Sequence, residues 1–197
     1  PNPIVLRPRE QSLCQAKQVI AVGRYVPQKG FDLLIEAWRI VNVRHPDWVL
    51  KIYGDGSPFE LQHQIDRLGL AESCRLKPST TAIEKKYRDS SIFVLSSRYE
   101  GFGMVLIEAM ACGLPAVAFD CPSGPSEIVR DGEDGYLVEN GKVEELAKRI
   151  CDLIKDDLLR KEMGKRAQLN SARFHMENIA AQWKDLFESF GKNTKGD

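Results

Sequence analysis

The sequence predicts an α/β domain: a doubly wound, parallel, six-stranded sheet of the Rossmann-like kind, with helices on both faces. Short apolar runs of the kind that form buried strands recur along the chain. A segment with apolar residues at helical spacing follows each of them, which is the alternation expected of a parallel sheet. The chain has 197 residues, of which 43% are hydrophobic, so one substantial domain is expected.

The first half of the chain contains three of these strand and helix pairs. The strands are expected at residues 18–23, 48–54 and 74–78. The helices are expected at residues 31–46, 58–70 and 81–89. Leu34, Trp38 and Val41 lie on one face of the first helix, which ends at Pro46, and Pro58 suits the first turn of the second.

The second half continues the alternation and ends in three successive helices. The strands are expected at residues 91–97, 115–120 and 135–140. The helices are expected at residues 103–113, 124–132, 142–155, 157–173 and 177–190. One domain is therefore predicted over residues 1–190, with a proline-rich and charged linker at residues 1–16 and a polar tail at residues 191–197.

The composition argues against several classes of function. The 28 basic and 28 acidic residues cancel, so nucleic-acid binding has no bulk electrostatic support. No run of eighteen apolar residues predicts a membrane span. The five cysteines form no C-x-x-C pair and the three histidines are scattered, so neither a disulfide framework nor a metal site is expected, and a reducing cytoplasm fits.

Two glycine pairs follow strands but do not complete a dinucleotide-binding motif. Residues 54–56 and 101–103 both match G-x-G, whereas the third glycine is replaced by Phe59 and Leu106. The Walker A pattern is also missing. Nicotinamide enzymes and P-loop nucleotide hydrolases are therefore poorly supported.

The loop after the first strand offers two cations at the carboxyl end of the sheet. Arg24 follows Gly23 directly, and Lys29 precedes the first helix. A planar guanidinium and a compact ammonium suit the oxygens of a diphosphate. The alternative is an ordinary solvated loop, because surface charges are usually solvated.

The loop after the fourth strand combines glycines with a helix start. Gly101 and Gly103 allow the main chain to turn and to approach a ligand closely. The free amides at Gly103, Met104 and Val105, with the positive end of the helix dipole, predict an anion site.

Two glutamates flank this predicted anion site. Glu108 lies one turn beyond Met104 and would repel a phosphate, so it is expected to accept hydrogen bonds from ribose hydroxyls. Glu100 could serve hydroxyls on the other side of the phosphates. A helix-capping or surface role is the alternative, but Glu108 stands inside the apolar run MVLIEAMA, where a charge needs a partner or a use. The order ribose, diphosphate, sugar describes a nucleotide sugar.

Three stretches carry a family resemblance: GRYVPQKGFDLLIEA, EGFGMVLIEAMACGLP and SGPSEIVRDGEDGYLV. They resemble the carboxyl-terminal, donor-binding domain of retaining glycosyltransferases of GT-B fold, and specifically the E-x7-E group that includes bacterial cell-surface polysaccharide transferases. Glu100 and Glu108 match the paired glutamates, and Arg24 and Lys29 match the R-x4-K pair. The likeness runs over nearly the whole chain.

The resemblance implies a role for each matching residue. Arg24 and Lys29, beside Gly23, would bind the diphosphate leaving group, Glu108 the ribose, and Glu100 the donor sugar. The amides of residues 101–104 (Gly101, Phe102, Gly103, Met104) would contact sugar and phosphate. The base would lie near residues 76–78, including Lys77, although RLKPSTT lacks the glycine that the family usually has after this strand.

The resemblance also implies the reaction and its partners. A hexosyl group would pass, with retention, from a nucleotide diphosphate sugar (UDP-hexose or UDP-N-acetylhexosamine) to a glycan or lipid-linked acceptor, without metal or other cofactor. The enzyme would be cytoplasmic, and peripheral at the inner membrane face where the acceptor is lipid-linked. The acceptor would bind an amino-terminal domain that this sequence lacks, so the isolated chain is expected to be inactive.

Some alternatives remain open from the sequence. The chain could be a nucleotide-binding module without catalysis, or part of a related GT-B epimerase or phosphorylase. In the family, residues 1–16 would connect the domains, and helix 177–190 would pack toward the amino-terminal domain. The apolar residues of that helix would then be partly exposed rather than part of this domain's core; they are Trp183, Leu186, Phe187 and Phe190.

Overall fold

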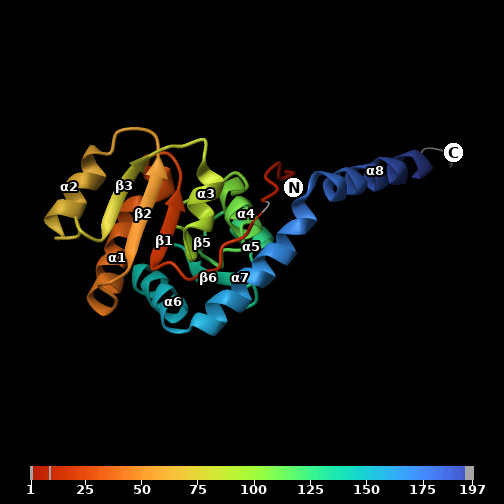
Figure 1. Cartoon of the computed structure of the whole chain (residues 1–197). Helices are drawn as coiled ribbons and strands as arrows, with labels where there is room; N and C mark the ends of the chain where they lie inside the picture. Colours follow the sequence, from red (N-terminus) through yellow and green to blue (C-terminus); the bar gives the residue numbers. More distant parts are fainter. Residues whose placement is uncertain (1, 9, 194–197) are drawn as a thin grey trace.

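The computed structural model describes residues 2–8 and 10–193 and contains a six-stranded, all-parallel sheet. Its strands are β1 (Gln18–Val22), β2 (Val49–Gly54), β3 (Cys74–Pro78), β4 (Ile92–Leu95), β5 (Ala116–Asp120) and β6 (Gly135–Glu139). The order across the sheet is β3-β2-β1-β4-β5-β6, so the direction of winding reverses between β1 and β4. Figure 1 shows β3, β2 and β1 side by side. Such a switch point opens a crevice at the carboxyl ends of the strands.

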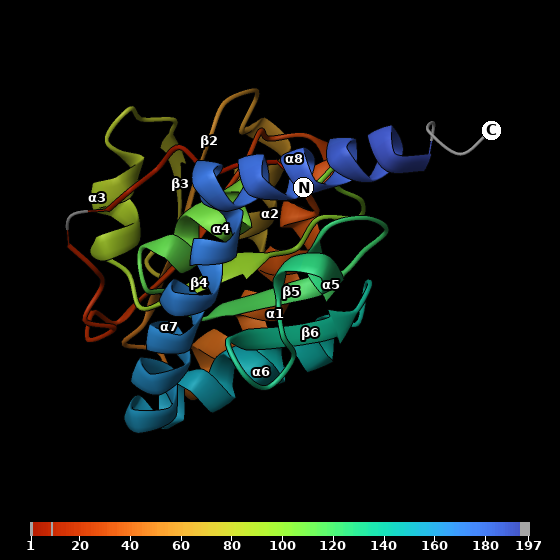
Figure 2. The ribbon, with the colours of Figure 1, turned by 90° about the vertical axis from the view of Figure 1, so that its right-hand side faces the viewer.

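Helices connect the strands and cover both faces of the sheet (Figures 1 and 2). They are η1 (Pro27–Lys29), α1 (Phe31–Arg44), α2 (Phe59–Arg67), α3 (Ile83–Arg88), α4 (Met104–Ala111), α5 (Pro125–Ile128), α6 (Val143–Lys155), α7 (Asp157–Ser171), η2 (Ala172–Phe174) and α8 (Met176–Asn193). The predicted doubly wound, six-stranded fold is confirmed.

Alternation along the strands divides the core into two layers. Val19 and Ile52 point to one face, where Leu34 and Trp38 of α1 and Ile150 of α6 pack against them. Successive side chains of a strand point to opposite faces, so the residues that alternate with these pack in the second layer of the core, on the other face of the sheet.

The second layer lies under α3, α4 and α5. Ile20 and Phe93 of the sheet pack there with Tyr87 of α3. Ile4 and Cys14, from the region expected to be a linker, are buried in the same layer, and a hydrogen bond joins the Ile4 amide to the Phe174 carbonyl oxygen at 2.8 Å. This amino-terminal region therefore packs on the domain.

The element boundaries differ from the expected ones mainly near the carboxyl end. The helix expected over residues 124–132 ends at Ile128, because Val129 is extended and the buried Asp134 accepts a hydrogen bond from the Arg130 amide. α8 continues through Asn193, and residues 194–197 of the expected tail lie outside the described part. Among the described residues, no helix combines the length and apolar character needed to cross a bilayer.

Candidate donor-binding site

The switch point brings the two loops singled out by the sequence to neighbouring strand ends. The β1–α1 loop carries Arg24 and Lys29, and the β4–α4 loop carries Glu100. Hydrogen bonds hold the loops together, since the Arg98 amide donates to the Gln28 carbonyl oxygen at 2.8 Å and the Ser96 hydroxyl to the Lys29 carbonyl oxygen at 2.9 Å. Their close packing follows from the pairing of β1 with β4.

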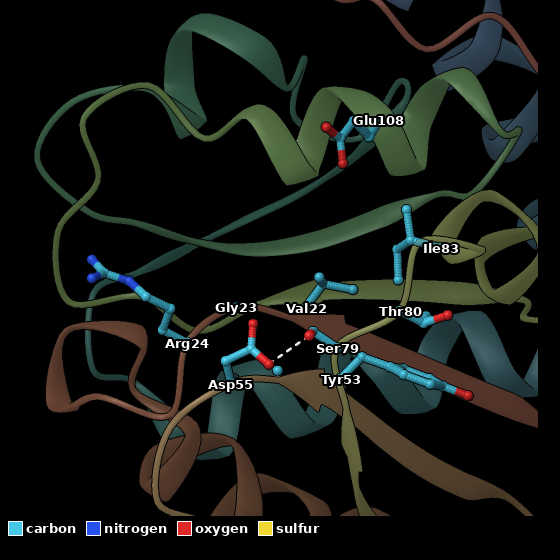
Figure 3. A pocket seen from close by; sticks show the side chains of 10 residues that line it. Val22, Gly23, Arg24, Tyr53, Asp55, Ser79, Thr80, Ile83 and Glu108 are labelled. Carbon is cyan, nitrogen blue, oxygen red and sulfur yellow. Dashed lines mark hydrogen bonds between the residues drawn. The ribbon is translucent and has the colours of Figure 1, made fainter.

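A cavity of about 270 Å³ opens at this edge of the sheet. Three of the residues that line it, Gly23, Arg24 and Glu108, are predicted site residues. The others come from the ends of β1, β2 and β3 and from α3: Val22, Tyr53, Gly54, Asp55, Ser79, Thr80 and Ile83. In Figure 3, Glu108 on α4 faces the cavity from one side, while Tyr53, Asp55 and Ser79 lie on the opposite side. Arg24 and Glu108, from separate segments, thus border one space.

Glu108 is held at the cavity by a buried tyrosine. The Tyr87 hydroxyl donates a hydrogen bond to Glu108 Oε2 at 3.3 Å, and the Tyr87 ring packs edge-on against Phe93. Burial raises the pKa of the Glu108 carboxyl, and the Tyr87 hydrogen bond lowers it to a smaller extent. The carboxylate therefore has one protein donor and room for others, such as hydroxyl groups, to donate to it.

Lys29 and Glu100 form an ion pair beside the cavity. Lys29 Nζ lies 2.7 Å from Glu100 Oε1, and both side chains are largely buried, with 15% and 6% exposed. The Ser97 hydroxyl also donates to Glu100 Oε1, at 2.6 Å. The sequence predicted that Lys29 binds the diphosphate and Glu100 the donor sugar, whereas in this structure the two side chains form an ion pair with each other. The stem of Lys29 lies against Gly23, which itself lines the cavity.

The β4–α4 loop leads into the start of α4. Gly103 has φ 92°, the left-handed conformation that favours glycine at this position before Met104. Gly101 does not need that conformation, and open space surrounds the position of its absent side chain. The Phe102 ring packs edge-on against Phe174, and the side chain is half-buried.

Lys77 does not line the cavity. Its main chain is bound by Tyr25, whose hydroxyl accepts from the Lys77 amide at 3.1 Å and donates to the Lys77 carbonyl oxygen. The same hydroxyl lies 3.0 Å from the Ile52 carbonyl oxygen. Of the strand end expected to hold a base, the cavity lining therefore contains Ser79 and Thr80 but none of residues 76–78.

Seven of the residues that line the cavity were not predicted as site residues: Val22, Tyr53, Gly54, Asp55, Ser79, Thr80 and Ile83. A hydrogen bond from the Ser79 hydroxyl to Asp55 joins the ends of β2 and β3 (Figure 3). The signal for Asp55 was present, because it follows a predicted strand at the carboxyl edge where ligands bind. Asp55 had been considered only as part of an incomplete dinucleotide motif.

Comparison with known proteins identifies the family. The profile of the family described as "Glycosyl transferases group 1" matches residues 6–170. The chain belongs to this group 1 glycosyltransferase family. The resemblance inferred from the three motifs is therefore confirmed.

Relatives named as glycosyltransferases agree with this placement. The amylovoran biosynthesis glycosyltransferase AmsD of Erwinia amylovora is 41% identical over 170 residues, which are 86% of this chain and 47% of AmsD. An uncharacterized glycosyltransferase of Haemophilus influenzae is 36% identical over 187 residues, 94% of this chain and 53% of that protein. The chain thus spans about half the length of these two relatives.

A solved structure has the same fold. A mutant of TarM from Staphylococcus aureus, in complex with fondaparinux, alpha-GlcNAc-glycerol and UDP, superimposes with a TM-score of 0.84 and 35% identity. The match covers 92% of this chain and 37% of the TarM chain.

Proposed function

We propose that this chain is the donor-binding half of a retaining glycosyltransferase that transfers a hexosyl group from a nucleotide diphosphate sugar to a glycan or lipid-linked acceptor in surface polysaccharide synthesis. The observation that carries the proposal is the convergence of Arg24 and Glu108 on one cavity at the switch point. Membership of the group 1 family supports the reaction class, and a TarM structure solved with UDP supports a uridine nucleotide.

The charges around the cavity suit the departure of a diphosphate. Negative charge grows on the leaving group as the sugar bond breaks, and fixed cations and helix amides stabilise that charge. Arg24, at the cavity edge, and the start of α4 at Met104 supply this positive field. Glu108 accepts hydrogen bonds from the ribose hydroxyls, as a carboxylate can accept several.

The Lys29–Glu100 pair supplies a second cation for the diphosphate and an acceptor for the hydroxyls of the donor sugar. When a donor enters, Lys29 turns from Glu100 toward the diphosphate, and Glu100 accepts hydrogen bonds from the sugar hydroxyls. The exchange is balanced, because each buried charge keeps a partner of opposite polarity throughout. The pair therefore holds both side chains in place before the donor arrives.

Calorimetry with UDP, GDP and ADP tests donor binding on this chain. UDP is expected to bind, and Arg24→Ala is expected to weaken UDP binding about tenfold or more, since a charge-assisted hydrogen bond contributes about 1.5–3 kcal/mol. Arg67→Ala, which removes an exposed guanidinium from α2, is the matched control and should leave the affinity unchanged. Equal UDP affinity in the Arg24 variant would refute the role assigned to this side chain.

Catalysis is tested in the longer enzyme that this proposal assumes. There, Arg24→Ala is expected to lower kcat/KM about a hundred- to a thousandfold, because it removes transition-state charge stabilisation. We propose a cytoplasmic reaction without a metal ion, so a chelator should leave both UDP affinity and transfer unchanged. Tight UDP binding without transfer by the longer enzyme would favour a binding module.

A further inference from the structure

A group of cations lies on one face of the sheet beside the cavity. Lys51 on β2 is the register partner of Arg75 on β3, and Tyr53 is the partner of Lys77. Since side chains alternate along a strand, Lys51, Arg75 and Lys77 share one face. Lys86 of α3 lies close to them. We call these four residues the β2–β3 basic surface; they are Lys51, Arg75, Lys77 and Lys86.

The charges of the β2–β3 basic surface are not compensated by ion pairs. Within residues 2–8 and 10–193, none of the four cations has a carboxylate within salt-bridge distance, and Arg75 donates only to the Glu72 carbonyl oxygen, at 3.4 Å. Burial, followed by the positive charges of Lys77, Lys86 and Arg75, lowers the pKa of Lys51, and Asp89 opposes this shift. Four neighbouring cations without a salt bridge in the described part of the chain form a site of positive potential.

The β2–β3 basic surface continues to the mouth of the cavity. Tyr53, two residues beyond Lys51 on β2, lines the cavity, and so does Ser79, two residues beyond Lys77. A long ligand on this surface would therefore lie next to the donor without occupying the donor's place.

The shape and composition of this surface favour a polymer chain over a membrane. Lys51, Lys77 and Lys86 are half-buried beside α3, so a flat bilayer would not reach them as it reaches protruding lysines. The exposed large apolar side chains of the described residues, which a membrane could take up, lie on other elements than β2, β3 and α3. An extended anionic chain can instead follow a row of cations along the sheet.

We propose that the β2–β3 basic surface binds a polyanionic polysaccharide chain, one whose repeating units carry phosphate or carboxylate groups. The four cations pair with successive anionic groups and keep the polymer beside the donor cavity. That this polymer is the growing acceptor rests on the proposed function. The binding surface itself does not depend on that function.

The proposal is tested by titrating the 197-residue chain with polygalacturonate and with size-defined inorganic polyphosphate, using neutral dextran as the uncharged control. Both anionic polymers should bind, with an affinity that falls as salt rises. Arg75→Glu combined with Lys86→Glu should weaken binding at least about tenfold, since charge reversal makes like charges repel at this surface. Lys148→Glu combined with Lys165→Glu changes the net charge equally on exposed positions of α6 and α7 and should have little effect.

Three results would overturn the proposal: no binding of either anionic polymer, equal losses in the two double variants, or binding only to phosphatidylglycerol-containing vesicles and not to the polymers. UDP affinity is measured on the same variants and should not change. If the unaltered chain binds the polymers, the Arg75 and Lys86 double variant loses that binding, and neither protein binds UDP, the proposed function is refuted while this surface stands. Normal UDP binding without polymer binding would refute the surface alone.

Discussion

Glu108 is a carboxylate in a helix of otherwise apolar residues. Its neighbours Ile107 and Ala109 are fully buried, and the Tyr87 hydroxyl is the protein donor that it meets. Burial penalises the charged form, which is why the pKa of Glu108 is raised. In the folded state without ligand, the ionised side chain is therefore destabilising at neutral pH.

Glu108→Gln is expected to increase the free energy of unfolding at pH 7 and to weaken UDP binding about tenfold. A raised folded-state pKa means that the cost of the charge is present above that pKa and is lost as pH falls toward the unfolded-state value. The stability difference between variant and wild type should therefore shrink on acidification. Denaturant titrations at several pH values test this, with the exposed Glu72→Gln as control. A less stable Gln variant at pH 7 would contradict the argument.

Tyr25 positions the loop that carries Arg24. Its hydroxyl contacts the main chain of Ile52 and Lys77, and its amide donates to the Asp55 carbonyl oxygen at 2.7 Å. Burial raises the pKa of this phenol to about 12, so the hydroxyl remains a donor over the physiological range. One side chain thereby ties the β1–α1 loop to two neighbouring strands.

Tyr25→Phe is expected to lower the free energy of unfolding by about 1 kcal/mol, since it removes the partner of the Lys77 main chain. UDP binding should weaken as well, because the Arg24 loop loses its tie to β2 and β3. Urea titration and calorimetry measure the two effects. Tyr99→Phe, at an exposed position, should change neither.

At the scale of elements, the ends of β1 and β2 approach each other more closely than side chains permit. A Cβ atom at Gly54 would lie 2.0 Å from the Gly23 carbonyl oxygen and 3.1 Å from the Tyr25 ring. The close approach places Arg24 and Asp55 on the same cavity. The glycine at the end of β2 is therefore required by packing between strands.

Gly54→Ala should destabilise the chain by roughly 1–3 kcal/mol, because the added methyl group collides with backbone that cannot move aside. The measurement is the unfolding midpoint in urea. Gly101→Ala is the matched control, since open space surrounds that position and stability should be unchanged. Equal stability of the Gly54 variant and wild type would show that the strand ends can separate.

At the scale of the whole molecule, α8 extends away from the sheet (Figure 1). Ile179 near its start is buried, whereas Trp183 is 50% exposed and Phe187 is 65% exposed, with their rings stacked 5.8 Å apart. The side chain of Phe190 lies outside the described part. We propose that this apolar face packs against the amino-terminal domain of the longer enzyme.

Trp183→Gln combined with Phe187→Gln should leave the free energy of unfolding of this chain within about 0.5 kcal/mol of wild type, as expected for surface positions. Ile179→Gln should lower the free energy of unfolding by at least about 2 kcal/mol, because it buries an amide group that has no hydrogen-bond partner there. Chemical denaturation separates these outcomes. A large loss in the double variant would mean that α8 belongs to the core of this domain.

Much of the fold could be predicted because its elements are local. Strand β3 was expected over residues 74–78 and is found there, and α6 was expected to end at residue 155 and does so. Two residues of the candidate site, Arg24 and Glu108, were also predicted. Both lie in segments that follow a predicted strand, and parallel sheets bind ligands at the carboxyl ends of their strands. Local pattern could not show that Lys77 lies outside the cavity lining, because the hydrogen bond between its main chain and Tyr25 joins residues 52 positions apart in the sequence.

The sequence by itself determined the alternation of strands and helices, the family, and the two loops that carry the charged residues, because periodicity and motif spacing are properties of neighbouring residues. Only the tertiary structure decided that Lys29 pairs with Glu100, that Asp55 and Ser79 join the cavity, and that unpaired cations gather on β2 and β3. These features depend on the order of strands in the sheet. Strand order depends on how the whole chain buries both faces of the sheet, so it cannot be predicted from any single segment.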